Sequence, residues 1–375
     1  MQYNVAKAEK PNRAPFRVKP REAVFRMSPY VPSSSFRFMG RGDGRFLKMD
    51  ANEADIRPSP VVYEEIKEFL ESGHLNWYPD FEATELRRKI SDYAHRSPEE
   101  IRVFNGSDSA LDHICRTFVA RDDHVVISSP TYDHFRVFAE ALGARAEFVF
   151  GDSPFDSNTG ELFRAVTPAT KLVYLCNPDN PTGRTYDEAT VRRLLDALEN
   201  GILVVDEAYF EFAKLTMAGL LDSYPHLIVS RTFSKAFGLA GLRCGYILAD
   251  EACVRLIDRI RNGKDVNALA QVAAVAALKD TDHMERYVQE VAAAKQWLAE
   301  RLRLLGFDVV MTPANFVLLR VPDPRTFARK LEDRGVFIRD RSDVPQLDRC
   351  VRITVGSLEH CRRLFKILEK HAPES

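Results

Sequence analysis

The sequence has almost no excess charge of either sign, and this limits what the chain can bind. Its 375 residues include 53 Lys plus Arg and 54 Asp plus Glu, which leaves a formal net charge of −1. Proteins that hold nucleic acids or anionic membranes usually present a strong basic field. We therefore expect no nucleic-acid partner and no membrane partner, and we expect local groups to bind any ligand.

Long hydrophobic runs and paired cysteines are also missing. No stretch approaches the roughly 18 apolar residues of a membrane helix, and the basic amino terminus lacks the apolar segment of a secretory signal. The six cysteines include no C-x-x-C pair, and no cluster with histidine has metal-ligand spacing. We expect reduced, mostly buried thiols, no bound metal and a cytoplasmic location.

Apolar material is nevertheless plentiful, because hydrophobic residues make up 45% of the chain. This is enough for a globular enzyme with two or more core units. From Ile101 onward, short apolar runs such as KLVYLC and ILVVD alternate with amphipathic stretches. Unbroken apolar runs are typical of parallel strands that helices cover on both faces, so the pattern predicts an α/β fold. A ligand site is then expected at the carboxyl ends of the strands.

After the run GLRCGYIL the pattern changes to long helices and then to strand–helix units around FVLLRV and VRITV. This change indicates a second, smaller domain. Amphipathic spacing and cap residues predict the main helices. Their expected ranges are about 107–119, 132–142, 187–198, 251–279 and 284–305.

Polar loops that follow the expected strands carry the residues of chemical interest. Residues 105–109 (NGSDS) open a helix whose N–H groups and dipole suit a phosphate, although simple helix capping is an alternative. Residues 177–183 (NPDNPTG) form a tight loop that presents the Asn180 amide or is an ordinary turn. Asp206 ends the strand ILVVD, where a buried carboxylate needs a cationic or hydrogen-bonding partner or else caps a helix.

The fourth loop, residues 230–245, places a single lysine among small and apolar residues. Desolvation there would lower the pKa of Lys235 and make its amine a usable nucleophile. Arg243 follows eight positions later, close enough for its guanidinium to return to the same pocket as a phosphate clamp.

Three of these loops occur in a familiar order. NPDNPTG, DEAY and SKAFGLAGLR resemble the motifs of the pyridoxal-phosphate aminotransferases of fold type I, in particular the histidinol-phosphate aminotransferase branch. The similarity runs from about Met27 to the carboxyl end and includes SPY, MDANE, NWYP, PTY, NF and RITVG. Their joint occurrence is far more specific than any one motif.

The resemblance implies a two-domain architecture with pyridoxal 5′-phosphate as cofactor. A large cofactor-binding domain over residues 56–264 would hold a mostly parallel seven-stranded sheet between helices. A smaller α+β domain would combine residues 26–55 and 265–375. Residues 1–25 would form a basic amino-terminal arm that either covers the site or stays disordered.

The resemblance also implies the roles of the cofactor-binding residues. Lys235 matches the lysine that holds the cofactor as a Schiff base and then carries a proton between substrate and cofactor. Asp206 matches the carboxylate that keeps the pyridinium nitrogen protonated. The other implied contacts are the donors Asn180 and Tyr209, the stacked ring of Tyr132, and a phosphate cradle of Ser107, Asp108, Ser234 and Arg243. The implied catalytic residues are Lys235, Asp206 and Tyr209.

The implied substrate side is built from arginines and from closing residues. Arg352 matches the arginine that takes the amino acid carboxylate, with a structural salt bridge as the alternative. Arg339 is implied to receive the far end of the substrate, and Tyr30 and Asn52 match positions that close over it. Tyr78 matches a tyrosine that reaches the phosphate from the neighbouring subunit, so the resemblance implies a homodimer with active sites at its interface.

Departures from the family motifs leave substrate choice open. Residues 52–55 read NEAD where the family has NENP, and residues 261–267 (RNGKDVN) replace a Pro-containing turn that normally lines the partner's pocket. One hypothesis is that Lys264, together with Arg261, reads an anionic substrate group across the dimer interface. The alternative is a solvated helix end.

These features predict amino transfer between glutamate or 2-oxoglutarate and a small, phosphorylated, histidinol phosphate-like compound through Lys235. An alternative keeps the cofactor and changes the reaction, as in a threonine-phosphate decarboxylase or an amino acid oxidase. A more remote alternative is a non-catalytic ligand-binding module. That module would have no chemical need for the lysine.

Overall fold

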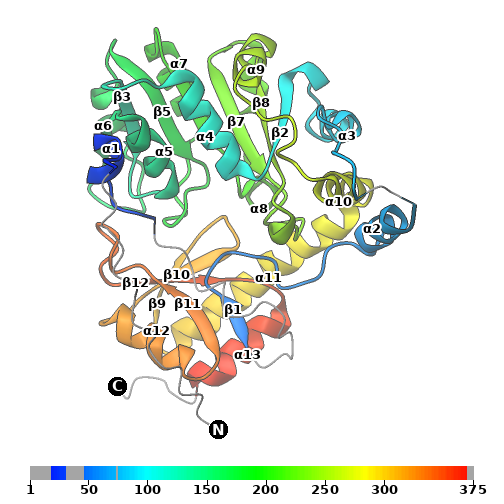
Figure 1. Ribbon diagram of the computed structural model, residues 1–375. Coiled ribbons are helices and arrows are strands. Elements are labelled where there is room, and N and C mark those ends of the chain that lie inside the picture. The colour runs from blue at the N-terminus through cyan, green and yellow to red at the C-terminus, as the bar shows by residue number, and fades with distance from the viewer. Residues whose placement is uncertain (1–17, 31–45, 73–74, 370–375) are drawn as a thin grey trace, which may run out of the picture.

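The chain folds into two lobes, and one long helix, α11 (Thr281–Leu304), runs from the larger lobe into the smaller one (Figure 1). The computed structural model describes residues 18–30, 46–72 and 75–369. Most of the expected amino-terminal arm, residues 1–17, lies outside the described residues. Its last part forms the short helix α1 (Glu22–Arg26), which packs against α5 (His134–Leu142) of the larger lobe, so residues 22–26 are helical rather than extended.

The larger lobe contains a seven-stranded sheet of order β2-β8-β7-β6-β5-β3-β4. Only β8 runs against its neighbours, so the prediction of a mostly parallel sheet is confirmed. The strands are β2 (Ile101–Phe104), β3 (His124–Ser128), β4 (Arg145–Val149), β5 (Thr170–Cys176), β6 (Ile202–Asp206), β7 (Leu227–Thr232) and β8 (Gly245–Ala249). The apolar pattern missed β4, because this edge strand is largely exposed and carries no apolar run.

Helices cover both faces of this sheet, as unbroken apolar strands require. One buried cluster joins the sheet to α4, α5 and α9, and the other joins it to α3, α6, α7 and α10. The helices of the lobe not yet given are α2 (Pro60–Ser72), α3 (Thr84–Ala94), α4 (Ser107–Phe118), α6 (Thr159–Ala165), α7 (Glu188–Ala197), α8 (Phe210–Ala213), α9 (Glu251–Asp258) and α10 (Ala268–Lys279).

The smaller lobe combines segments from both ends of the chain. Its five-stranded sheet has the order β1-β11-β12-β10-β9, and β1 (Leu47–Met49) pairs in parallel with β11 (Val336–Asp340). The other strands are β9 (Asp308–Met311), β10 (Phe316–Arg320) and β12 (Cys350–Thr354). The helices are α11 (Thr281–Leu304), α12 (Pro324–Glu332) and α13 (Leu358–Glu369).

One expected helix is wrong in extent. The range 251–279 is not one helix but two, α9 and α10, separated by a turn in which Asp265 N–H donates to the Asn262 carbonyl at 3.0 Å. The Asn267 side chain accepts from Ala270 N–H at 2.9 Å and caps α10. Asparagine competes with the helical backbone for hydrogen bonds, so it begins a new helix here instead of continuing the old one.

The packing of α10 also bears on the domain boundary expected at residue 265. The buried face of α10 belongs to the core of the large lobe and contacts α2. Along α11, Met284 and Val288 join that core, whereas Tyr287 and the buried residues from Val291 onward join the core of the small lobe. The boundary stays a prediction, and this packing favours a change of domain within α11.

Two further expectations concern burial. All six cysteines are buried and unpaired, as expected for reduced thiols. Over the described ranges 18–30, 46–72 and 75–369, no helix is both long enough and apolar enough to span a bilayer.

Candidate active site

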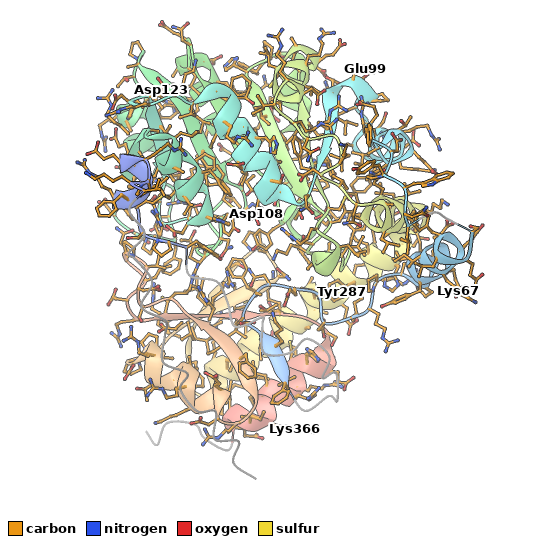
Figure 2. All side chains as sticks on the ribbon, viewed as in Figure 1. Lys67, Glu99, Asp108, Asp123, Tyr287 and Lys366 are labelled. Carbon is orange, nitrogen blue, oxygen red and sulfur yellow. The ribbon has the colours of Figure 1, made fainter. Side chains whose placement is uncertain are left out.

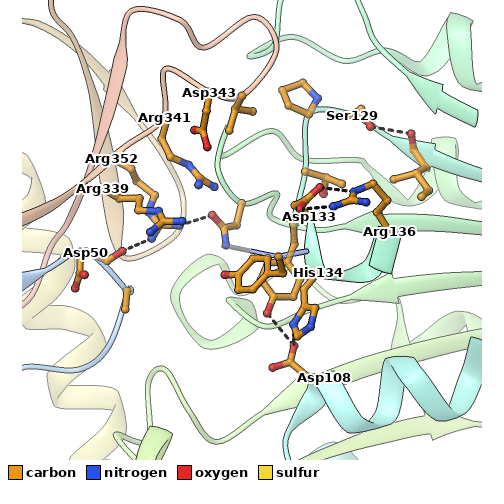
Figure 3. Close-up of a pocket in the computed structure, with 18 of the residues that line it drawn as sticks. Asp50, Asp108, Ser129, Asp133, His134, Arg136, Arg339, Arg341, Asp343 and Arg352 are labelled. Atoms are coloured by element: carbon orange, nitrogen blue, oxygen red, sulfur yellow. Dashed lines mark hydrogen bonds and ion pairs between the residues drawn. The ribbon is translucent and has the colours of Figure 1, made fainter. Parts of the chain in front are cut away.

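A cavity of about 1030 Å³ lies where the loops of the large sheet face the small lobe (Figure 3). The carboxyl ends of β5 and β7 lead directly into the loops that carry Asn180 and Lys235, and Asp206 is the last residue of β6. The small lobe contributes β11, β12 and the turn that follows β11. This placement agrees with the expected ligand site of an open α/β sheet.

Lys235 projects into this cavity from the loop after β7. Its Nζ donates to the Ala51 carbonyl at 2.9 Å, so the large lobe meets the segment after β1 at this point. Burial, helped by the nearby Arg352 guanidinium, lowers the pKa of the lysine to about 8. The neutral, nucleophilic form of the amine is therefore far more populated near neutral pH than that of an ordinary lysine, although the protonated form still predominates at pH 7.

Asp206 ends β6 and is almost fully buried, with 3% of its surface exposed. Tyr174 O–H donates to its Oδ2 at 3.0 Å, and Ala208 N–H donates to its Oδ1 at 3.1 Å. Burial raises the pKa of the carboxyl to about 7, even though the Tyr174 hydrogen bond acts in the opposite direction. Within the described residues no cation pairs with it, so the carboxylate would be stabilised by a cationic ligand group.

An anion cradle surrounds the first turn of α4. Gly106 precedes the helix at φ +82°, and a Cβ atom there would meet Arg243 Nη2 at 2.5 Å. Arg243 Nη1 donates to Ser234 Oγ at 3.2 Å, which confirms that the two side chains lie together. Asp108 stands at the end of α4 that faces the small lobe (Figure 2). Helix N–H groups, a hydroxyl and a guanidinium together suit a phosphate.

Three more predicted cofactor residues lie in or beside the cavity. Tyr132 lines it and donates through its hydroxyl to Asp108 Oδ1 at 2.9 Å. Asn180 lines it too, and its Oδ1 accepts from Arg352 Nη1 at 2.5 Å, which leaves the amide nitrogen as a donor. Tyr209 is buried behind the lining, with 2% of its surface exposed.

The arginines predicted for the substrate enter from the small lobe (Figure 3). Arg352 lies on β12 opposite Arg339 on β11. Arg352 donates to Asn180 and, through Nη2, to the Asp50 carbonyl at 2.6 Å, and its buried Nε has no partner among the described residues. Tyr30 also lines the cavity, where its ring stacks on His134 with centroids 4.6 Å apart.

Asn52 does not line the cavity, although it lies close by. It is fully buried, donates through Nδ2 to the Tyr209 hydroxyl at 2.9 Å, and accepts from Thr354 Oγ1 at 3.1 Å. These hydrogen bonds hold the Tyr209 hydroxyl in place and link the two lobes. They do not place the Asn52 amide over a substrate.

Tyr78 and Lys264 also lie outside this cavity, and they lie together. Lys264 Nζ stands 4.6 Å from the centre of the Tyr78 ring, which is 72% exposed as a residue. The buried guanidinium of Arg261 forms two ion pairs, with Asp258 at 3.0 Å and with Glu82 at 3.5 Å. These pairs do not favour the suggestion that Arg261 reads a substrate anion, which stays a prediction.

The sequence reasoning missed Arg341, which lines the cavity one residue beyond the end of β11. A usable signal was present, because Arg341 follows Arg339 by two positions and alternate residues of an extended chain share a face. It also missed His134 and Arg136 on α5, which line the opposite side. Nothing in the local pattern separates these two from ordinary surface residues of a helix.

Comparisons with known proteins agree with this geometry. The model of the aminotransferase class I and II family matches residues 45–368. A dihydroxyacetone phosphate transaminase of Campylobacter jejuni is 37% identical over 340 residues, which cover 89% of this chain and 92% of that protein. A histidinol-phosphate aminotransferase of Ruminiclostridium cellulolyticum is 32% identical over 318 residues, covering 84% and 89% of the two chains.

A solved structure extends the agreement to the whole fold. The histidinol-phosphate aminotransferase of Sinorhizobium meliloti, in complex with pyridoxal 5′-phosphate, superposes with a TM-score of 0.84 at 30% identity. The match covers 95% of this chain and 98% of that one.

Proposed function

Because this chain belongs to the class I and II aminotransferases, we propose that it moves an amino group between glutamate and a small phosphorylated carbonyl compound. It is a transaminase of fold type I that uses pyridoxal 5′-phosphate. The observation that carries the proposal is the position of Lys235, whose amine has a lowered pKa and lines the same cavity as an anion cradle and a group of arginines.

The residues of the cavity fit the cofactor. Its phosphate matches the cradle of α4, Ser234 and Arg243, where the absence of a side chain at Gly106 leaves room for the guanidinium. Its cationic ring nitrogen matches Asp206, which is buried and has no cationic partner in the described part of the chain. A lysine with a lowered pKa stands within the same cavity.

When bound, the cofactor supplies an electron sink for the charge left on a substrate carbon after loss of a proton. The side chains supply position and proton transfer. Lys235 Nζ accepts and returns the proton, and the Asp206 carboxylate keeps the ring nitrogen protonated. Asn180 and Tyr209 orient the ring, and Arg352 takes a carboxylate through its planar guanidinium.

We further propose that the active form is a homodimer in the cytosol. Two exposed aromatic rings lie beside Lys264, those of Tyr78 and Phe81, with 72% and 46% of the residue surface exposed. Leu75, a few positions earlier in the chain, is 62% exposed. Such clusters usually mark contact with another protein surface. A second copy would cover them and bring Tyr78 toward the neighbouring cavity. Six unpaired, buried cysteines suit a reducing compartment.

The reaction is tested with the purified enzyme and its cofactor. Glutamate should yield 2-oxoglutarate in step with loss of the cofactor's aldehyde absorbance, and dihydroxyacetone phosphate or imidazole-acetol phosphate should restore it. Release of carbon dioxide without any keto acid, or consumption of oxygen, would contradict amino transfer and support the decarboxylase or oxidase alternative.

The position of the cofactor is tested by borohydride reduction followed by peptide mass spectrometry. Lys295 is a matched control, because burial also lowers its pKa to about 8, yet it donates to the Ala314 carbonyl at 2.7 Å and does not line the cavity. The label should appear on Lys235, and Lys235→Ala should abolish turnover. A label on Lys295 would refute the assignment.

A further inference from the structure

Three guanidinium groups meet on the small-lobe side of the cavity (Figure 3). Arg339 and Arg352 lie opposite each other on adjacent strands, and Arg341 follows on the segment that leaves β11. Like charges at this spacing repel each other, so an unliganded cluster is unfavourable. An anion with more than one negative charge would relieve the repulsion.

Arg341 is the member of this cluster without an assigned role. Neither a hydrogen bond nor an ion pair engages its guanidinium within the described residues, and its buried Nε lacks a partner there. Burial is the main reason why the pKa of Arg341 falls to about 9, and the positive charges of Arg352 and Arg339 lower it further. The negative charge of Asp343 raises this pKa, but no hydrogen bond joins these two described side chains. Buried donors are normally paired, so this group lacks a ligand.

The other arginines on the large-lobe side of the cavity are already engaged. Arg136 pairs with Asp133 at 2.8 Å and with Glu140 at 2.6 Å. Arg243 pairs with Asp108 at 3.3 Å and belongs to the cofactor's phosphate cradle. A second anion in the cavity is therefore expected near Arg341 and not near these residues.

The backbone around Arg341 is held in place. Its N–H donates to the Cys350 carbonyl at 3.0 Å, and its own carbonyl accepts from Val344 N–H at 3.0 Å. Gln346 Nε2 donates to the Gly151 carbonyl of the large lobe at 2.8 Å, so this turn bridges the two lobes. Val344 and Phe150 also line the cavity, and their apolar side chains reduce competition from water.

We propose that Arg341 is a specificity-determining residue that binds the phosphate monoester of the amino acceptor at the end away from the reacting carbon. This inference rests on the proposed amino transfer and assigns its substrate class. A phosphate dianion has enough oxygen acceptors and negative charge to bind several guanidinium groups at once. A carboxylate has two oxygens and one charge, and a single bidentate arginine can pair with both oxygens. Lys264, the earlier candidate for this task, lies outside the cavity of its own chain and could act only at that of a second copy.

A binding experiment tests the site without turnover. Inorganic phosphate is titrated by calorimetry into the enzyme with its cofactor bound, so that the cradle at Arg243 is already filled. Arg341→Gln should raise the dissociation constant by about tenfold or more, because charge-assisted hydrogen bonds are lost. Arg341→Lys should raise it by only about threefold, because the charge remains. The matched control Arg349→Gln, at an exposed arginine outside the cavity lining, should change it less than twofold.

Kinetics with paired acceptors separate specificity from general damage. For Arg341→Gln, KM for dihydroxyacetone phosphate should rise about tenfold while kcat and the KM for unphosphorylated dihydroxyacetone change little. An equal change for both acceptors, or an unchanged phosphate dissociation constant, overturns the assignment of Arg341. If the parent enzyme forms no 2-oxoglutarate from glutamate, the proposed amino transfer fails, but the phosphate titration still decides whether Arg341 binds the anion.

Discussion

At the scale of single residues, Asp206 shows a conflict between stability and function. Its carboxylate is buried with two hydrogen bonds and no cation in the described residues. Burial raises its pKa from 3.8 to about 7, so the folded chain holds this proton where the unfolded chain has lost it. Stability therefore falls as pH rises from about 4 to about 7, and the full cost is present above that range.

Asp206→Asn should consequently stabilise the protein without cofactor at pH 8. The free energy of unfolding should rise by on the order of 4 kcal/mol, which corresponds to this pKa change. The gain should be smaller at pH 5, where the buried Asp206 carboxyl is still protonated and lowers stability less. The same substitution should weaken cofactor binding at least tenfold, because the ring nitrogen loses its anionic partner. Thermal unfolding at both pH values and a cofactor titration check these two effects. A variant that is less stable than the parent at pH 8 would contradict this account.

Residue-scale prediction from sequence succeeded where the chemistry is local. Lys235 sits among small and apolar neighbours in the chain itself, so its desolvation was foreseeable. Asn52 was different, because its partners Tyr209 and Thr354 are far away in sequence. No local pattern in the sequence reveals that the Asn52 amide forms hydrogen bonds that link the two lobes.

At the scale of elements, the first turn of α4 builds the anion cradle. Gly106 adopts a positive φ that other residues tolerate poorly, and Gly245 allows β8 to approach closely, since a Cβ there would meet Ser107 N at 2.5 Å. The helix dipole and unpaired N–H groups of the first turn then face the site. Two glycines thus set the distance between a helix end and Arg243.

Gly106→Ala should displace the Arg243 guanidinium and strain the backbone before α4. We expect the cofactor dissociation constant to rise at least tenfold, with most of the secondary structure kept. Gly219→Ala is the control, because a Cβ there meets nothing within 4 Å and should change affinity less than twofold. Absorbance titration measures both variants, and equal affinities would show that the cradle does not need this glycine.

At the scale of the whole molecule, the cavity exists because two lobes meet. Lys235 comes from the large lobe, and the arginine cluster comes from the small lobe. The exposed residues Tyr78 and Lys264 stand apart from that cavity and contact each other. In the proposed dimer they would reach the cavity of a second copy, so that one copy alone would have an incomplete site.

Hybrid dimers test this arrangement. Lys235→Ala and Tyr78→Ala should each be nearly inactive as pure dimers. Unfolding and refolding the two together should restore activity to roughly a quarter of the parent level, because half of the dimers are hybrid and each hybrid has one intact site. Sedimentation should show a dimer in every sample. Absence of any restored activity would mean that Tyr78 acts within its own chain, and a fully active Tyr78→Ala dimer would mean that it has no role.

Local patterns in the sequence determined the alternation of strands and helices, the loops after the strands, and Lys235 as the nucleophile. Apolar periodicity and turn chemistry act over a few residues, so they can be read along the chain. The exposed edge strand β4 escaped this reading because it buries little apolar surface.

Only the tertiary structure decided which cations share a cavity and which do not. Arg341, Arg352 and Lys235 line one cavity, whereas Lys264 lies against a tyrosine ring outside it and Arg261 pairs with two carboxylates. The reason is physical: a guanidinium's partners depend on how the lobes close and how the strands align. Those contacts join residues that are more than a hundred positions apart in the chain.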